Sequence, residues 1–285
     1  MGNPPRQPLP RSGRSTAAVA RRHRQRSRVV DQWSRVGSIL LLLSCAIIIV
    51  QPKWSFPRSE AGGAGAQPVE LVGTADEISY FLEIALGSEF GPDSAINSAV
   101  IRKWQSPVII RVQGAPTAED LETLGAVIAE INAELAAIPG LTPEMVSLIW
   151  DDNHPSPNLS ISFLPEAEFS QVEPNYRPGN LGFFWTYPNA QGVIQRATVL
   201  ISTSGVTQQE RSHLIREELT QSLGLMNDSW RDQASIFYQG WTDSTTYTEL
   251  DRKLIRWLYS PRLQPGMGMA TVRQVLPQHP HGNGS

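Results

Sequence analysis

The chain has 285 residues, of which 40% are hydrophobic and 18% are charged, with one cysteine and five histidines. This composition is typical of a globular protein with room for one sizeable core. A single cysteine excludes a disulfide framework and a cysteine-rich zinc module, and scattered histidines without a His-x-x-x-His pair exclude an ordinary histidine-rich metal site.

Charge is distributed unevenly along the sequence. Residues 1–35 contain nine arginines and one acidic residue, a net charge of +8, whereas residues 51–285 contain 15 basic and 26 acidic residues, a net charge of −11. An acidic main domain argues against nucleic acid as a partner, because phosphate binding needs a basic face. The basic leader contains too few large apolar side chains to build a core, so we expect residues 1–35 to be disordered.

An uncharged apolar run, VGSILLLLSCAIIIV, follows the leader at residues 36–50, and Trp33 and Trp54 flank it at interfacial positions. We predict one transmembrane helix at residues 36–53, with a basic cytoplasmic N-terminus and an extracytoplasmic main domain in a bacterial membrane. A cleaved signal peptide, lipidation at Cys45 and a buried core helix are the alternatives. Residues 54–68, rich in Gly, Ala and Pro, predict a flexible linker.

Residues 69–263 predict one folded α+β domain with a twisted, mostly parallel sheet. Periodicity and turn residues predict helices at about 76–85, 117–138, 207–223 and 248–260, and strands at 106–114, 145–150, 158–165, 182–187 and 193–203. Thr117 with Asp120, and Thr207 with Glu210, have the spacing of capping boxes. The first strand reads as buried on both faces, because its apolar residues are almost continuous. Residues 264–285 predict a disordered tail.

The helix that begins near Thr207 carries the candidate site. His213, Glu217 and Gln221 follow one another at steps of four, so they project from one face, and Glu218 lies about 100° away. Such residues are also the commonest ones on a solvated helix face, so spacing alone does not separate a site from an exposed surface.

The stretch from Ala197 to Leu263 resembles the catalytic half of the matrixin-type metzincin zinc peptidases. Their pattern is His-Glu-x-x-His-x-x-Gly-x-x-His, then a Ser-Ile-Met-Tyr turn and a helix that ends in Leu-Tyr. The corresponding residues are Glu217-Glu218-x-x-Gln221-x-x-Gly224-x-x-Asn227, then Ser235-Ile236-Phe237-Tyr238, then Asp251, Ile255, Leu258 and Tyr259. The resemblance implies a zincin-like sheet with an active-site helix and a C-terminal helix.

The sequence contains the phrases FLEIALGSEF, REELTQSLGLMNDS and LDRKLIRWLYSPRLQPGM. They are similar to the bacterial domain-of-unknown-function family 2927 (DUF2927), over residues 70–267. This family has no established activity, so the resemblance implies a fold and no reaction.

The chemistry of the peptidase pattern is replaced in this chain. Glu217, Gln221 and Asn227 stand at the positions of the zinc-binding histidines, and Phe237 replaces the methionine under the metal, while Glu218 keeps the position of the general base. Zinc prefers Cys and His, so we expect neither zinc nor ordinary zinc peptidase activity.

Several hypotheses follow from these substitutions. The preferred one is an inactive peptidase homologue, in which the cleft binds a peptide or envelope component along the strand at 182–187, with His213, Asp228, Phe237 and Tyr238 as binding residues. In the second, Glu217, Gln221, Asn227 and Asp228 hold a hard divalent cation such as Ca²⁺, Mg²⁺ or Mn²⁺, and Glu218 is the base of a hydrolysis. In the third, His213 and Glu217 form a shifted metal pair. A purely structural role for these side chains is the fourth.

Two further groups have alternative interpretations. Residues 151–154, Asp-Asp-Asn-His, are either cation ligands or, as we prefer, a plain turn. The aromatic residues of the strand at 182–187 either line a groove or pack in the core and at the sheet edge.

Overall fold

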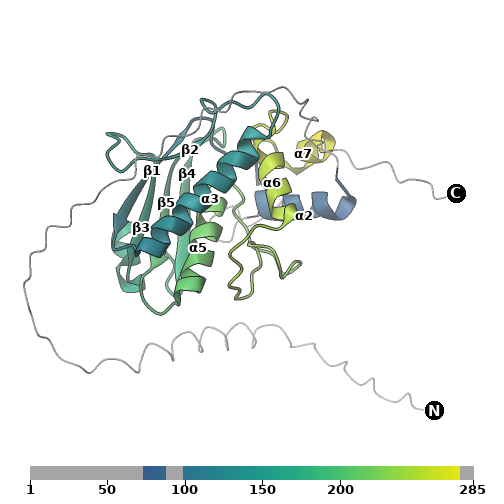
Figure 1. Ribbon diagram of the computed structural model, residues 1–285. Helices are drawn as coiled ribbons and strands as arrows, with labels where there is room; N and C mark the ends of the chain where they lie inside the picture. The colour runs from purple at the N-terminus through teal and green to yellow at the C-terminus, as the bar shows by residue number, and fades with distance from the viewer. Residues whose placement is uncertain (1–72, 88–98, 277–285) are drawn as a thin grey trace, which may run out of the picture. The chain divides into compact units, whose positions relative to one another are not determined.

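The computed structural model describes residues 73–87 and 99–276. These residues form a mixed α and β fold in which α3 (Ala118–Ala136) and α5 (Gln208–Gln221) lie side by side across one face of a five-stranded sheet (Figure 1). The helices α2 (Ala75–Leu86), α6 (Glu249–Tyr259) and α7 (Met269–Val275) are grouped beside this layer. The predicted transmembrane segment, leader and linker lie outside the described residues.

The sheet is mostly parallel, as the sequence predicts. Its strands are β1 (Val108–Gly114), β2 (Leu148–Trp150), β3 (Leu159–Leu164), β4 (Gly182–Pro188) and β5 (Ile194–Ser202). Their order is β2-β1-β3-β5-β4, and β4 is antiparallel to β5 whereas the other pairs are parallel. The end strands of the sheet are therefore β2 and β4.

One face of the sheet is buried more completely than the other, so the prediction that the first strand is buried on both faces was wrong. The side chains of Val108 and Ile110 are inaccessible to solvent. The alternate residues, Ile109 and Arg111, are half-buried. The reason is that α3 and α5 cover only one face. A small second core of Phe169, Tyr176, Phe183 and Leu200 covers part of the other face beneath the segment with η2 (Glu166–Glu168) and α4 (Phe169–Val172).

Four helices begin with the same N-terminal capping motif. The N-cap threonine accepts a hydrogen bond from the backbone of the third helical residue, and the acidic side chain of that residue accepts one from the threonine backbone. The pairs are Thr74 with Glu77, Thr117 with Asp120, Thr207 with Glu210 and Thr248 with Asp251. The two capping boxes predicted from the sequence are confirmed.

The folded region continues beyond Leu263. Helix α7 lies in the segment that we expected to be disordered, and Val272 and Leu276 are buried in the main core. The prediction of a disordered tail therefore does not hold for residues 269–276. Across the two described ranges, no helix is both long and apolar enough to cross a membrane.

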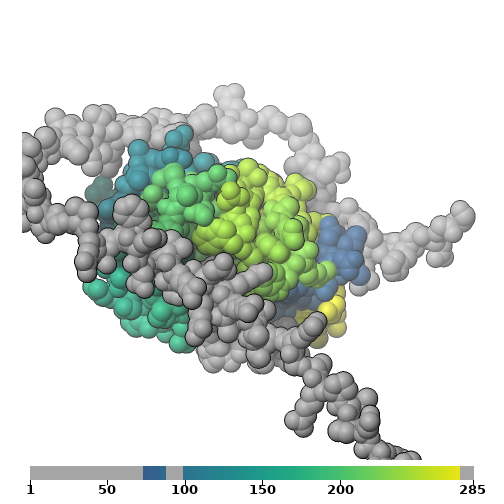
Figure 2. Space-filling view, turned by 90° about the horizontal axis from the view of Figure 1, so that it is seen from below, coloured from purple at the N-terminus to yellow at the C-terminus, as the bar shows by residue number. Residues whose placement is uncertain are grey.

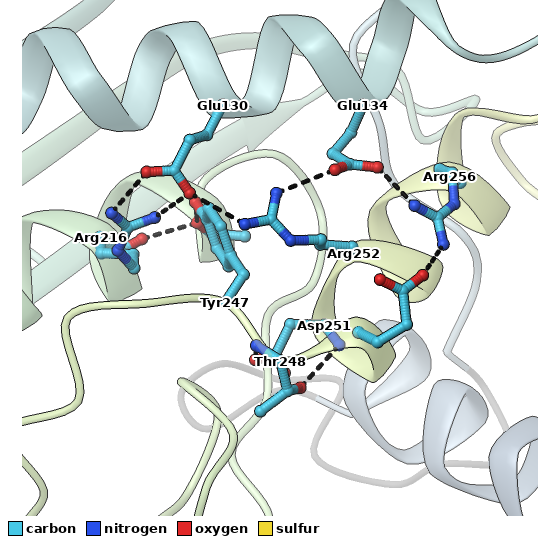
Figure 3. Close-up of polar contacts among 10 residues, drawn as sticks. Glu130, Glu134, Arg216, Tyr247, Thr248, Asp251, Arg252 and Arg256 are labelled. Carbon is cyan, nitrogen blue, oxygen red and sulfur yellow. Dashed lines mark hydrogen bonds and ion pairs between the residues drawn. The ribbon is translucent and has the colours of Figure 1, made fainter.

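Ion pairs connect α3, α5 and α6 (Figure 3). Arg216 of α5 donates two hydrogen bonds to Glu130 of α3, with N···O distances of 3.0 and 2.9 Å. Arg252 and Arg256 of α6 both donate to Glu134, at 2.9 and 2.6 Å. Glu130 and Glu134 lie one helical turn apart on α3. They hold α5, which carries the candidate site, and α6 against α3.

The candidate site on helix α5

His213 is buried and connects α5 to the loop that follows it. Its Nε2 lies 3.2 Å from Glu217 Oε2, and its Nδ1 lies 2.6 Å from the carbonyl oxygen of Ser244. Burial lowers the pKa of His213, but the Glu217 carboxylate, the Ser244 carbonyl and the charge of Asp243 outweigh burial, so the pKa is raised above its ordinary value. The structure therefore brings His213 and Glu217 together as an ion pair.

The other two residues that the sequence offered as candidate metal ligands are also held by hydrogen bonds. Gln221 Nε2 donates to Asp228 Oδ1 at 2.6 Å, and Asn227 Nδ2 donates to the Asp228 carbonyl at 2.8 Å. The Asn227 backbone N–H donates to Ile84 O of α2 at 3.2 Å. Both amide NH₂ groups thus organise the turn after α5.

Gly224 allows this turn. Its φ is +122°, and a Cβ at this position would lie 2.0 Å from Arg102 O, so a side chain would collide with backbone. A glycine is needed here because the chain turns sharply and passes close to another segment.

Glu218 faces the sheet. Its side chain is buried, and a Cβ on Gly182 of β4 would lie 2.4 Å from Glu218 Oε1. Thr186 of β4 contacts the next segment, with its Oγ1 3.8 Å from the sulfur of Met226. The end strand β4 therefore borders both α5 and the loop that follows it.

The turn at residues 235–238 rests on the N-terminus of α6. Ser235 Oγ donates to Asp251 Oδ1 at 2.5 Å and accepts from Tyr80 OH at 3.0 Å. Burial raises the pKa of Asp251, and hydrogen bonds from Ser235 and Thr248 oppose this effect in part. Phe237 is inaccessible to solvent and accepts a backbone hydrogen bond from Ser229, at 2.8 Å, whereas Tyr238 is partly exposed.

The donor set at the site does not suit zinc. The carboxylate of Glu217 is paired with His213, and the amide groups of Gln221 and Asn227 donate to Asp228. Within residues 73–87 and 99–276, no group of three or more His, Cys, Asp or Glu side chains is placed to hold a metal ion. The structure thus brings His213, Glu217, Gln221, Asn227 and Asp228 together on α5 and the turn that follows it, whereas Tyr238 contacts the ring of Trp230.

The two other groups of candidate residues have structural roles. Asp151 Oδ1 accepts from Asn153 N at 3.0 Å, and Asp152 Oδ1 accepts from Val112 N at 2.7 Å, so residues 151–154 form the expected turn. Phe183 packs in the second core and stacks on Trp185, with ring centroids 6.3 Å apart. Core and edge packing therefore accounts for these aromatic side chains.

Sequence reasoning missed Ser244, Gly182 and the ion pairs to α3. A signal for the ion pairs is present, because Glu130 and Glu134 of α3 and Arg252 and Arg256 of α6 each have a spacing of four. Nothing in the local sequence marks Ser244, whose backbone carbonyl is the group that contacts His213.

The family described as "Protein of unknown function (DUF2927)" matches residues 75–278. The chain belongs to this family. The DUF2927 region begins at the first residue of α2 and ends two residues beyond Leu276, so it includes every described helix and strand, α7 among them. No curated protein matches the chain.

Proposed function

We propose that this DUF2927 domain is an exported, membrane-tethered binding module with a metzincin-like architecture, and that it binds extended peptides or envelope components without hydrolysing them. The observation that carries the proposal is an end strand, β4, directly beside a helix whose peptidase-like positions are occupied by Glu217, Gln221 and Asn227. The tether follows from the basic leader and the apolar run at residues 36–50.

Chain order and sheet topology support the metzincin-like part of the proposal. A long helix, α3, precedes the sheet edge, and α5 is followed by the 235–238 turn and then by α6, in the order of the peptidase pattern. The only antiparallel strand of the described sheet is the end strand beside α5. A peptide that added to this strand would lie along the site.

The alternation of hydrogen bonds between β4 and β5 indicates which backbone N–H and C=O groups of β4 a peptide would meet. The Ser202 N–H donates to Leu181 O, at 2.8 Å. Because hydrogen-bonded pairs alternate along an antiparallel ladder, Phe183, Trp185 and Tyr187 direct their backbone groups toward β5, while those of Phe184 and Thr186 point to the outer edge.

The opposite end strand is organised differently. Asn132 of α3 donates to Leu148 O at 2.9 Å and accepts from Leu148 N at 2.8 Å, so its amide takes the place of a neighbouring strand on β2. Such capping blocks the addition of a further strand. This contrast favours β4 over β2 as the edge that binds a peptide.

Peptide binding by the full-length protein tests the proposal. We expect a fluorescent decapeptide of alternating Thr and Gln to bind, and binding to weaken at least about tenfold when alternate peptide nitrogens are methylated or when Thr186→Pro removes an outward N–H of β4. Trp150→Pro, on β2, is the matched control and should leave the affinity unchanged. Equal affinity of the Thr186→Pro variant would contradict strand addition.

Mass spectrometry of the incubated peptide distinguishes the proposed binding module from the alternative function, a hydrolase. The proposal requires an intact peptide with or without added Ca²⁺, Mg²⁺, Mn²⁺ or Zn²⁺. Cleavage that depends on an added cation and disappears in Glu218→Gln would replace the binding module with a hydrolase in which Glu218 is the base.

A further inference from the structure

The loop at residues 225–248, between α5 and α6, carries exposed aromatic side chains. Trp230 is 55% and Trp241 is 51% exposed, and Tyr238 is partly exposed. Figure 2 shows this loop in yellow-green near the middle of one face of the molecule, beside the green of α5. Large aromatic rings at such exposure are typical of surfaces that contact a ligand.

Hydrogen bonds and a ring contact hold these aromatic residues in place. The Gln239 N–H donates to Ser229 O at 2.9 Å, next to the Ser229 to Phe237 bond, so two parts of the loop lie side by side. Trp230 and Tyr238 meet edge to face with ring centroids 5.6 Å apart. Trp241 Nε1 donates to Glu210 Oε1 of α5 at 3.1 Å. A ligand would therefore meet rings that are already ordered, which reduces the entropic cost of binding.

The surroundings of these rings are acidic. The loop contains Asp228, Asp232 and Asp243 and a single basic residue, Arg231. The Arg231 guanidinium is directed to α2, where it lies 3.6 Å from Glu83 and above the ring of Tyr80, 5.6 Å from its centroid. The adjoining helix α5 adds Glu210 in its first turn. Aromatic faces among carboxylates attract cations, and they disfavour an anionic lipid surface.

We propose that the exposed rings of the 225–248 loop, Trp230, Tyr238 and Trp241 (the aromatic surface), bind lysine and arginine side chains of the extended peptide, so that the domain prefers basic peptides. This inference rests on the proposed function, because β4 supplies the backbone contacts. Thr186 of β4 contacts Met226, at the start of the loop that carries the three rings.

The test compares three fluorescent decapeptides, in which Thr alternates with Lys, Gln or Glu, on the full-length protein. We expect the Lys peptide to bind at least about tenfold more tightly than the Gln peptide in 50 mM salt, and the Glu peptide to bind most weakly. Trp230→Ala and Trp241→Ala should each weaken binding of the Lys peptide about two- to fivefold and leave binding of the Gln peptide nearly unchanged. Trp150→Ala, which removes an exposed tryptophan from β2, is the matched control.

The outcomes separate this inference from the function on which it rests. Equal affinities for the Lys and Gln peptides, both lost in Thr186→Pro, would overturn the preference for basic peptides and leave strand addition intact. Tight binding of the Lys peptide that is unaffected by Thr186→Pro, but reduced by both tryptophan variants, would support the aromatic surface and overturn strand addition. Binding to vesicles of phosphatidylcholine and phosphatidylglycerol, lost in the tryptophan variants while none of the peptides binds, would overturn both and indicate a lipid surface.

Discussion

His213 illustrates how one side chain at the candidate site combines two tasks. Its ring closes the loop onto α5 through Ser244 and pairs with Glu217 on the same helix. A histidine with the Nδ1 proton on a carbonyl and a carboxylate at Nε2 is best satisfied as the cation, because both nitrogens then donate. Glu217, which the sequence offered as a candidate metal ligand, thus serves as the partner of the His213 ring.

The raised pKa of His213 makes the stability of the fold depend on pH. A group whose pKa is higher in the folded state contributes fully below its unfolded value, about 6.5, and the contribution is lost as pH rises through the folded value. We therefore expect the free energy of unfolding to fall as the pH rises above about 6.5, by about 1.4 kcal/mol for each unit that separates the two pKa values.

Urea unfolding at several pH values measures this effect. The His213→Gln variant should lose the pH-dependent part, and His154→Gln, which removes the other histidine of residues 73–87 and 99–276, should retain it. A wild-type curve parallel to that of His213→Gln across this pH range would mean that the Glu217 ion pair contributes nothing.

Ion pairs between helices position the site at the level of secondary-structure elements. Arg216 is almost completely buried, and its guanidinium lies over the ring of Tyr247, 4.4 Å from the ring centroid, while it pairs with Glu130 (Figure 3). Tyr247 OH lies 2.7 Å from Thr220 Oγ1 of α5. Burial is the main reason that the pKa of Tyr247 is raised. The end of the loop is thereby clamped between α5 and α6.

Removal of the Glu130 charge should leave Arg216 buried without its bidentate partner. Glu130→Gln is expected to lower the free energy of unfolding by about 2 kcal/mol, less than the ~3–5 kcal/mol of a fully buried pair, because a third of the Glu130 side chain is exposed. Glu122→Gln on the exposed side of α3 is the matched control and should change stability by less than about 0.5 kcal/mol. Equal denaturation midpoints for the two variants would show that the network is energetically neutral.

The elements were predictable to the extent that they depend on local chemistry. Thr207, Glu210 and Gly224 define the ends of α5 and its turn through capping and backbone geometry, which a short sequence window contains. The half-buried state of Ile109 was not predictable in this way, because it depends on which sheet face the helices cover. The partners of His213 and Arg216 were missed for the same reason, since Ser244 and Glu130 are distant in sequence.

At the scale of the described fold, a short segment before β1 joins the sheet to the C-terminal part of the chain. Ile101 exchanges backbone hydrogen bonds with Met267 and Gly266, at 2.9 Å each, and the buried Lys103 Nζ donates to the carbonyls of Leu258, Ser260 and Leu263 at the end of α6. Burial lowers the pKa of Lys103 to about 8. Through these contacts the C-terminal part of the chain belongs to the same core as the sheet.

Two truncated chains therefore test which part of the C-terminus the fold requires. A chain that ends at Arg262 lacks Leu263, Val272 and Leu276, which are almost inaccessible in the main core. Each buried aliphatic side chain contributes roughly 1.5–3 kcal/mol, so the loss of three is about 4.5–9 kcal/mol, comparable with the entire stability of a domain. We expect this chain to show no cooperative thermal transition by circular dichroism, whereas a chain that ends at Gln278, the last residue of the DUF2927 match, should melt as the full-length protein does. If the chain ending at Arg262 kept the full-length melting temperature, α7 would be an appendage that contributes nothing to the core.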